Sequence, residues 1–229
     1  MEKPKPKIVT LEEWRQARDE LRAAEKEATR AADALAARRR RLPMVRFADG
    51  YAFDTPEGAK TLLDLFDGRD QLVVYQFMDN GPDRYCPGCT WFTDNIPANA
   101  PSLLADQGVT WVNVSNMPLA QIERYKARSG WTMPFVSSRG TSFSADCDAG
   151  GGFMLTVFLR DGDDVYRTYS TTSRGIEKLV FTTGVFDLTA YGRREEWEDS
   201  PAGWPQNPTY AVPVPMEWGD VSTGFGTHR

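Results

Sequence analysis

The sequence predicts an α/β fold in which a mixed central sheet is flanked by helices. Two apolar, β-branched runs, Gln71 to Phe77 and Val109 to Val114, are typical of buried central strands. A helical stretch follows each run, and this alternation indicates parallel strands joined by crossover helices. A later pair of strands meets at the turn Asp161-Gly162-Asp163-Asp164, which favours an antiparallel hairpin. The sheet should therefore combine parallel and antiparallel strands.

A long helix is predicted for residues 10 to about 41, ahead of the sheet. Thr10 and Glu13 have the spacing of a capping box. Its apolar residues form a narrow heptad-like seam, because their spacings alternate between three and four. The seam consists of Trp14, Ala17, Leu21, Ala24, Ala28, Ala31 and Leu35. Either this helix lies along its own domain, or its alanines allow close approach of a second copy and a homodimer forms through it.

Proline and glycine divide the rest of the chain into shorter elements. The helix after the first strand should break near Pro97 or Pro101, because proline interrupts the backbone hydrogen-bond ladder. Pro118 to Ser129 fits a helix with proline in its first turn and Gly130 as its stop. The other expected elements are a strand pair from Val45 to Phe53, a helical turn from Thr61 to Phe66, hairpin strands from Phe153 to Leu159 and from Val165 to Ser170, and a final helix from Gly175 to Phe181.

Length and charge restrict the class of protein. The 229 residues suffice for one domain with appendages, and we expect a helical arm (1–43), an α/β domain (44–199) and an irregular Pro/Gly-rich tail (200–229). The net charge of -5 gives no overall nucleic-acid signature. Residues 1–46 carry a balance of +5 and the remainder -10, so the arm suits an acidic surface of its own chain or of a partner.

A cytoplasmic location is the default expectation. The first residues are charged rather than apolar, which predicts no secretory leader. No apolar run approaches the roughly 20 residues that span a bilayer. We therefore expect neither a membrane nor a nucleic acid as a partner.

The pentapeptide Cys86-Pro87-Gly88-Cys89-Thr90 is the most specific chemical signal in the chain. Cysteines separated by two residues can close a small disulfide ring. At a helix N-terminus, free backbone N–H groups and the helix dipole favour a thiolate. A strand, a Cys-x-x-Cys and a helix form the layout of a dithiol redox site, so Cys86 and Cys89 are the predicted catalytic pair.

The order of the elements is that of the thioredoxin fold, a βαβ unit followed by a ββα unit. In that fold a proline loop faces the cysteines, and its X-Pro bond is cis. Met133-Pro134 occupies this point of the topology, so we expect a cis bond there. Arg84 would also favour the thiolate. The residues expected to shape the substrate groove are Tyr85, Arg84, Thr132, Met133 and Pro134.

Two stretches resemble the peroxiredoxin branch of the thioredoxin superfamily. Leu63-Asp64-Leu65-Phe66 with Gly68-Arg69 resembles the lead-in turn of that branch, and Pro82 to Cys89 is similar to its motif Pro-x-x-x-Thr-x-x-Cys. On this register Cys89 is the peroxide-attacking residue and Cys86 replaces the threonine. On the thioredoxin register, Cys86 is the nucleophile and Cys89 the buried resolver. A peroxidase would also need a guanidinium, for which Arg139 and Arg160 are the candidates.

Nearly the whole chain resembles a thioredoxin-like family called domain of unknown function 899. Its members are usually described as dithiol-disulfide oxidoreductases by fold, so the resemblance implies the fold more than the activity. The tail departs from the family pattern, because Trp218-Gly219-Asp220-Val221 replaces a usual cluster of Trp, Arg, His and Asp. The resemblance is carried by Leu42-Pro43-Met44-Val45-Arg46, Cys86-Pro87-Gly88-Cys89, Trp91-Phe92-Thr93-Asp94-Asn95, Pro118-Leu119-Ala120, the stretch from Gly130 to Ser138, the stretch from Val157 to Gly162, and Tyr169-Ser170-Thr171.

Other chemistries fit the sequence less well. A zinc site needs four ligands, and besides the motif only Cys147 and His228 remain as Cys or His candidates. His228 is also a poor general base so close to the chain end, which disfavours a hydrolase. Phosphate-binding glycine loops of the Walker or Rossmann type are lacking, so we expect no nucleotide cofactor. Together with the shortage of ligands for zinc, this leads us to expect neither a cofactor nor a metal.

Three functions remain open at this point. The first is exchange with a protein or small-molecule disulfide, with a reductant that the sequence does not identify. The second is a thiol peroxidase led by Cys89, and the third is a non-catalytic oligomeric or ligand-binding scaffold. Cys147 lies between two carboxylates that disfavour its thiolate, so it is either incidental or a third-cysteine relay.

Overall fold

The computed structural model describes residues 4–82 and 84–208. They form two compact units: the residues up to Pro43 together with Ser200–Trp204, and the residues from Met44 to Asp199 with those from Pro205 onward. The first unit contains the long helix α1 (Leu11–Arg39). Its predicted capping box is confirmed, since the Glu13 N–H donates to Thr10 Oγ1 (3.3 Å) and the Thr10 N–H to Glu13 Oε2 (2.9 Å). Within the described residues, no helix combines the length and apolarity of a membrane span.

The second unit is built on one mixed sheet with the strand order β1-β8-β7-β4-β5-β6-β2-β3 among the described residues. Strands β4 and β5 are parallel, β4 and β7 antiparallel, and β7 and β8 form the predicted hairpin. This central order confirms the thioredoxin-like fold: a βαβ unit, followed by two antiparallel strands that add to its first strand. The strands are β1 (Val45–Arg46), β2 (Phe53–Thr55), β3 (Gly58–Lys60), β4 (Gln71–Phe77), β5 (Val109–Ser115), β6 (Phe135–Ser137), β7 (Met154–Asp161) and β8 (Asp164–Thr171).

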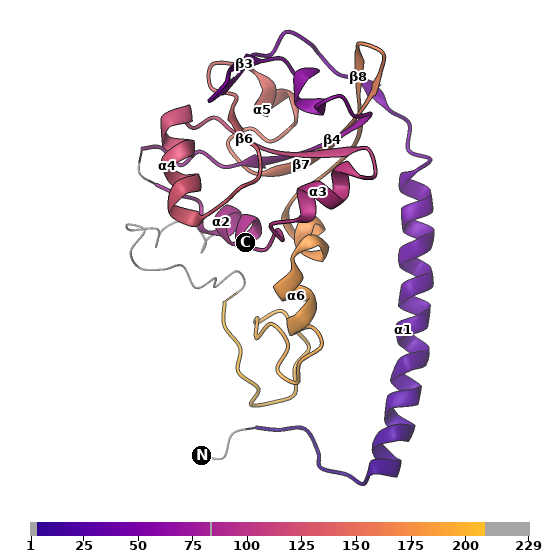
Figure 1. Ribbon diagram of the computed structural model, residues 1–229. Coiled ribbons are helices and arrows are strands. Elements are labelled where there is room, and N and C mark those ends of the chain that lie inside the picture. The colour runs from indigo at the N-terminus through magenta and orange to yellow at the C-terminus, as the bar shows by residue number, and fades with distance from the viewer. Residues whose placement is uncertain (1–3, 83, 209–229) are drawn as a thin grey trace. The chain divides into compact units, whose positions relative to one another are not determined.

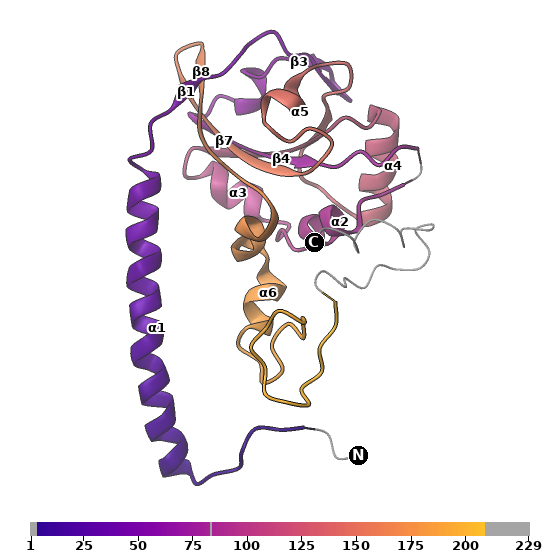
Figure 2. The same cartoon turned by 180° about the vertical axis from the view of Figure 1, so that it is seen from behind.

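Helices cover both faces of this sheet (Figures 1 and 2). The helices labelled α2, α3 and α4 lie on one face, and α5 lies on the other. Proline separates α2 from α3 and glycine ends α4 as predicted, with Gly130 in the left-handed conformation. The shorter elements of this unit are η1 (Asp64–Phe66), α2 (Pro87–Asp94), α3 (Ala100–Ala105), α4 (Leu119–Ser129), α5 (Phe143–Asp146), η2 (Ser173–Leu179) and α6 (Phe181–Phe186).

The sheet separates two hydrophobic cores. Side chains alternate between its faces, so that neighbouring residues of β4 enter different cores. Tyr75 and Phe77 pack with both motif cysteines in what we call the cysteine core. Leu72 and Val74 pack on the other face with Cys147, in what we call the opposite core.

Several predicted elements are corrected by the structure. The segment from Val45 to Phe53 forms no strand pair, because β1 pairs with β8 and β2 pairs with β3 and β6. Strand β6 was not predicted, and its three residues are too few for a recognisable period. The single final helix is replaced by η2 and α6, because Val180 between them is extended and buried in the cysteine core. Within the predicted tail, 209–229 lie outside the described residues, and with them His228 and Trp218.

Candidate active site

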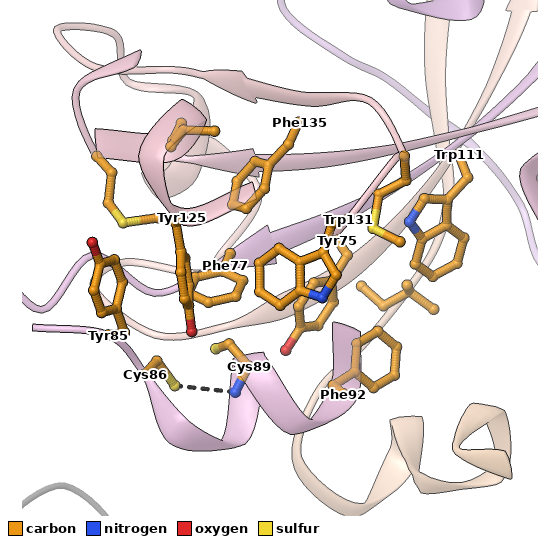
Figure 3. Close-up of a cluster of buried hydrophobic side chains, with 14 of the residues drawn as sticks. Tyr75, Phe77, Tyr85, Cys86, Cys89, Phe92, Trp111, Tyr125, Trp131 and Phe135 are labelled. Carbon is orange, nitrogen blue, oxygen red and sulfur yellow. Dashed lines mark hydrogen bonds between the residues drawn. The ribbon is translucent and has the colours of Figure 1, made fainter. Parts of the chain in front are cut away.

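The cysteine motif begins α2 as the sequence predicts. Cys86 is the N-cap residue, with extended backbone angles, and Pro87 occupies the first helical position. Proline suits this position because its missing N–H would have no partner inside the helix. The Cys86 sulfur accepts a hydrogen bond from the Cys89 N–H at 3.2 Å, which Figure 3 shows as a dashed line. A thiol therefore fills the capping role that a serine or aspartate oxygen usually has.

The surroundings of Cys86 lower the pKa of its thiol. The largest cause is a hydrogen bond from the Cys89 side chain, and smaller contributions from the backbone N–H groups of Cys89 and Gly88 act in the same direction. Burial acts in the opposite direction, because a charged sulfur loses hydration. Hydrogen bonds at the start of a helix thus outweigh burial and favour the thiolate.

Cys89 has the reverse behaviour, since burial raises the pKa of its thiol well above the usual value. The hydrogen bond to Cys86 and the negative charge of that neighbour act in the same direction. The Met78 N–H, 3.5 Å from the Cys89 sulfur, and the Tyr75 hydroxyl oppose the shift but do not cancel it. The two cysteines are therefore unequal: Cys86 ionises first and Cys89 keeps its proton.

Both sulfurs are covered by protein atoms. Cys86 is 0% exposed and Cys89 is 1% exposed, and the structure contains them as free thiols. The Tyr85 ring stacks on Tyr125 with ring centres 3.8 Å apart, close to Cys86 in Figure 3. The Tyr125 hydroxyl is hydrogen-bonded to that of Thr90. A substrate therefore reaches the Cys86 sulfur only if part of this cover moves.

A buried polar row fixes α2 to the sheet behind the cysteines. The Thr93 hydroxyl donates to the Cys89 carbonyl at 2.8 Å, and the Asn113 side-chain amide donates to Thr93 Oγ1 at 3.4 Å. Asn113 Oδ1 in turn accepts from the Trp111 indole N–H at 2.9 Å. These bonds satisfy polar groups in an otherwise apolar core, and the bond to Thr93 holds the last turn of α2 against β5.

The predicted groove residues lie in different environments. Tyr85 is buried in the cysteine core, and Arg84 beside it is exposed. Met133 is also buried in the cysteine core, where the Asn113 amide lies 3.7 Å from its sulfur. Thr132 and Pro134 on either side are exposed. The structure thus brings Tyr85 and Met133 into one core with the cysteines and leaves the other three at the surface.

The cis bond expected at Met133-Pro134 is a wrong prediction. The described part of the chain contains no cis peptide bond. Trans is the more stable isomer of an X-Pro bond unless the fold enforces cis, and here the Pro134 carbonyl accepts the Asn113 N–H at 2.9 Å in the trans form. The loop also leads into β6 and α5 before β7 begins, so it does not enter the antiparallel hairpin directly.

Arg160 cannot serve as the guanidinium of a peroxide site. The backbone N–H of Arg160 donates to the backbone carbonyl of Asp70, the residue just before β4. The cysteines instead follow the last residue of that strand. Seven strand residues at about 3.3 Å each separate the two ends by roughly 23 Å. Arg139 is exposed just after β6.

Cys147 lies in the opposite core, apart from the other two cysteines. Burial is the main cause that raises the pKa of its thiol to about 12, and Asp146 and Asp148 contribute in the same direction. The predicted effect of these two carboxylates is confirmed, although burial exceeds it. Because the sheet lies between Cys147 and the Cys86–Cys89 pair, the structure gives no support to the relay. Among the described residues, Cys, His, Asp and Glu form no cluster of three that could hold a metal.

Sequence reasoning missed the residues that enclose the pair. Tyr125 and Met78 contact the motif, and neither of them has a recognisable motif of its own. Asn113 was the one available signal, because a polar residue inside a buried apolar strand needs a hydrogen-bond partner.

Comparison with known families decides where the chain belongs. A family profile described as "Bacterial protein of unknown function (DUF899)" matches residues 3–218. The chain belongs to this family. The DUF899 match covers the arm, the sheet and the cysteine motif alike, which agrees with the resemblance seen in the sequence. No curated protein matches the chain.

Solved structures similar to this DUF899 chain are only distantly related to it. Peroxidoxin BcpB from Mycobacterium tuberculosis is 17% identical, with a TM-score of 0.41, over 56% of this chain and 86% of that one. A thiol:disulfide interchange protein from Bacteroides sp. is 12% identical, with a TM-score of 0.43, over 66% and 92%. A hypothetical protein, SMc02350 from Sinorhizobium meliloti 1021, is 18% identical, with a TM-score of 0.41, over 57% and 70%.

Proposed function

We propose that this DUF899 protein is a thiol-disulfide oxidoreductase in which Cys86 attacks first and Cys89 resolves. The observation that carries the proposal is the opposite pKa shift of two thiols within one turn of α2. A lowered pKa raises the fraction of thiolate at a given pH, and the thiolate is the attacking form of a thiol. A raised pKa keeps the second thiol protonated and therefore inert until the first step has occurred.

The reaction takes two exchange steps. The Cys86 thiolate attacks one sulfur of a protein or small-molecule disulfide, forms a mixed disulfide and releases the other substrate sulfur as a thiolate. Cys89 then loses its proton to solvent or to the departing thiolate and attacks the Cys86 sulfur. This closes the Cys86–Cys89 disulfide and releases the second substrate thiol. The substrate gains two electrons, and a dithiol reductant returns the pair to its starting state.

The burial of Cys86 limits which substrates react. Because Cys86 is 0% exposed, a disulfide sulfur reaches its thiolate only after neighbouring groups move, and we propose that the Tyr85 ring, stacked on Tyr125 in the same core, is the group that moves. An extended peptide or a small disulfide that displaces one ring fits this requirement better than a rigid protein surface. If the groups over Cys86 never move, the cysteines only fill the core and the protein is a scaffold. Measurement of the redox potential of the Cys86–Cys89 pair distinguishes this case from exchange.

A peroxidase led by Cys89 is less well supported. It would need a low thiol pKa at Cys89, and burial together with Cys86 has the reverse effect. We retain a cytoplasmic location as part of the proposal, because a reducing compartment keeps such a pair in the dithiol form between turnovers.

Assembly forms a separate part of the proposal. The apolar seam of α1 contains Trp14, Leu21 and Leu35, all of which are exposed. A heptad-like spacing with small residues between them is typical of a helix that packs closely against another. We therefore propose a homodimer formed through α1.

The decisive experiment measures the redox potential of the Cys86–Cys89 pair in the full-length protein. Reduced and oxidised fractions are separated by alkylation in a series of glutathione or dithiothreitol buffers. A two-electron transition between roughly -120 and -270 mV would match exchange proteins. Cys147→Ser is the matched control and should leave the potential unchanged.

Single variants then assign the order of attack. With a disulfide substrate, Cys89→Ser should accumulate a mixed disulfide on Cys86, whereas Cys86→Ser should form none. If no disulfide forms between the two cysteines, the exchange proposal fails. The peroxidase would instead be established if peroxide rapidly consumes a thiol in the Cys86→Ser variant but not in the Cys89→Ser variant.

A further inference from the structure

Met78, the residue that follows β4, contacts the sulfurs of both motif cysteines. The Cys86 thiol donates to Met78 Sδ, with the two sulfurs 3.6 Å apart. The Met78 N–H lies 3.5 Å from the Cys89 sulfur. Disulfide exchange uses two thiols and no thioether, so the proposed function leaves the Met78 sulfur without a role.

Met78 is also the most exposed of these three residues. Cys86 is 0% exposed and Cys89 is 1% exposed, whereas Met78 is half-buried and packs against the cysteine core. A small oxidant should therefore meet Met78 before it meets either thiol. Oxidation of a methionine gives a sulfoxide, and this product can be reduced back to the thioether.

The Cys86 sulfur is placed to attack a sulfoxide on Met78. Reacting atoms in a near-attack arrangement lie about 3–3.5 Å apart, and the sulfur–sulfur distance of 3.6 Å is only slightly longer. The hydrogen bonds that lower the pKa of the Cys86 thiol favour the thiolate, which is the attacking form. The Cys89 N–H, 3.2 Å from the Cys86 sulfur, brings the resolving residue into the same contact.

We propose that Cys86 and Cys89 reduce a sulfoxide formed on Met78, so that this thioether relays oxidation from a small oxidant to the buried pair. This chemistry rests on the proposed function, in which Cys86 attacks first and Cys89 resolves. It adds a hypohalous acid to the oxidants of the pair, because such an acid needs to reach only Met78.

Three steps balance the reaction. The hypohalous acid transfers its oxygen to the Met78 sulfur, and a halide ion and a proton leave. The Cys86 thiolate then attacks the sulfoxide sulfur, and the oxygen leaves as water with the protons of the two thiols. Finally, the Cys89 thiolate attacks the Cys86 sulfur, which breaks the bond between the Cys86 and Met78 sulfurs and returns its electron pair to the thioether. The sulfoxide gains two electrons and the dithiol loses two, and the same dithiol reductant restores the pair.

The first test follows the Met78 sulfoxide in the full-length protein by mass spectrometry. Hydrogen peroxide oxidises the methionines while a Cys86–Cys89 disulfide, formed beforehand with diamide, protects the cysteines. Dithiothreitol then reduces the disulfide and starts the reaction. We expect the Met78 sulfoxide to disappear at least tenfold faster than the Met44 sulfoxide of the same molecules.

Met44 is a suitable internal control. It is 46% exposed and precedes β1. Strands β8 and β7 lie between β1 and β4, and a spacing of about 4.8 Å per strand places β1 roughly 14 Å from β4. In Cys86→Ser, with Cys89 protected by methyl methanethiosulfonate during oxidation, both sulfoxides should persist in dithiothreitol.

The second test measures the relay in the reduced protein. Formation of the Cys86–Cys89 disulfide is timed with one equivalent of hypochlorous acid and, separately, with glutathione disulfide. Met78→Leu keeps an apolar side chain of similar size but has no sulfur, so the ratio of the first rate to the second should fall at least fivefold. Met44→Leu is the matched control and should leave this ratio unchanged.

Three results would overturn the relay. They are equal persistence of the Met78 and Met44 sulfoxides, equal loss of the Met78 sulfoxide in the wild type and in Cys86→Ser, and an unchanged rate ratio in a folded Met78→Leu protein. A pair that exchanges with glutathione disulfide while the Met78 sulfoxide persists refutes the relay alone. A pair that reduces the Met78 sulfoxide but exchanges with no substrate disulfide refutes the exchange function alone.

Discussion

Tyr85 precedes Cys86 and packs in the same core, and we predict that replacing its ring with alanine makes the Cys86 sulfur more reactive. The ring is 8% exposed and stacks on Tyr125 with an interplanar angle of 25°. In the wild type, a reagent reaches Cys86 only in molecules whose cover has opened. Tyr85→Ala removes the part of the opening free energy that comes from the stack.

The size of the effect follows from the stack. An aromatic pair contributes about 0.5–1.5 kcal/mol beyond the apolar area that it buries. Since about 1.4 kcal/mol corresponds to a factor of ten, the open fraction should rise by about 2- to 12-fold. The lost burial of the ring adds to this factor, so a twofold increase is the minimum that the structure allows.

The assay is the rate of iodoacetamide alkylation of Cys86, followed by mass spectrometry in a Cys89→Ser, Cys147→Ser background. Rates measured across pH separate the thiolate fraction from the accessibility of the sulfur. Tyr85→Phe is the matched control, because it keeps the ring and should change the rate less than twofold. Tyr51→Ala removes a buried ring from the opposite core and tests whether general destabilisation has the same effect.

A rate in Tyr85→Ala within twofold of the wild type would refute the reasoning, provided that the variant is folded. The same conclusion would follow if Tyr51→Ala accelerated alkylation equally, since exposure would then result from unfolding of the whole unit.

Two further predictions concern Cys147 and the helix α1. The Cys147 thiol has a pKa near 8.5 in the unfolded chain, and burial raises this pKa to about 12 in the folded protein. Between these two pH values only the unfolded thiol ionises. The free energy of unfolding of the wild type should therefore fall by about 1.4 kcal/mol per pH unit relative to Cys147→Ala. Urea unfolding at pH 8, 9 and 10 measures both slopes, and parallel slopes would contradict the buried state of this thiol. Light scattering after size exclusion should show a dimer for the wild type and a monomer for Leu21→Glu with Leu35→Glu; a monomeric wild type would exclude assembly through α1.

Local patterns were sufficient to predict the central elements. β4 and β5 are continuous apolar runs, and the β7–β8 hairpin follows from a turn in which Gly162 adopts a φ of +59°. The capping role of Cys86 also follows from local rules, because the motif stands where a strand ends and a helix begins. Each of these predictions depends on residues that are neighbours in the sequence.

The surroundings of the site could not be predicted in this way. Tyr125 reaches Thr90 across 35 positions, and its sequence neighbourhood indicates only a buried helix face. The isomer of Met133-Pro134 depends on which backbone groups the fold brings near, and here the trans form supplies an acceptor to β5. The stack of Tyr85 on Tyr125, in the core that buries Cys86, likewise joins two separate segments.

The sulfur of Cys86 is both the proposed nucleophile and the N-cap acceptor of α2. The redox state of this sulfur therefore affects the stability of the first turn of α2. As a thiolate it is a strong, charge-assisted acceptor for the Cys89 N–H and a favourable charge at the helix N-terminus. A sulfur in a disulfide has neither property, so each oxidation weakens the first turn of the helix and each reduction restores it. Stabilisation of the reduced form makes a disulfide a stronger oxidant. The helix cap therefore raises the reduction potential of the pair, and it lowers the driving force with which the dithiol reduces a substrate disulfide.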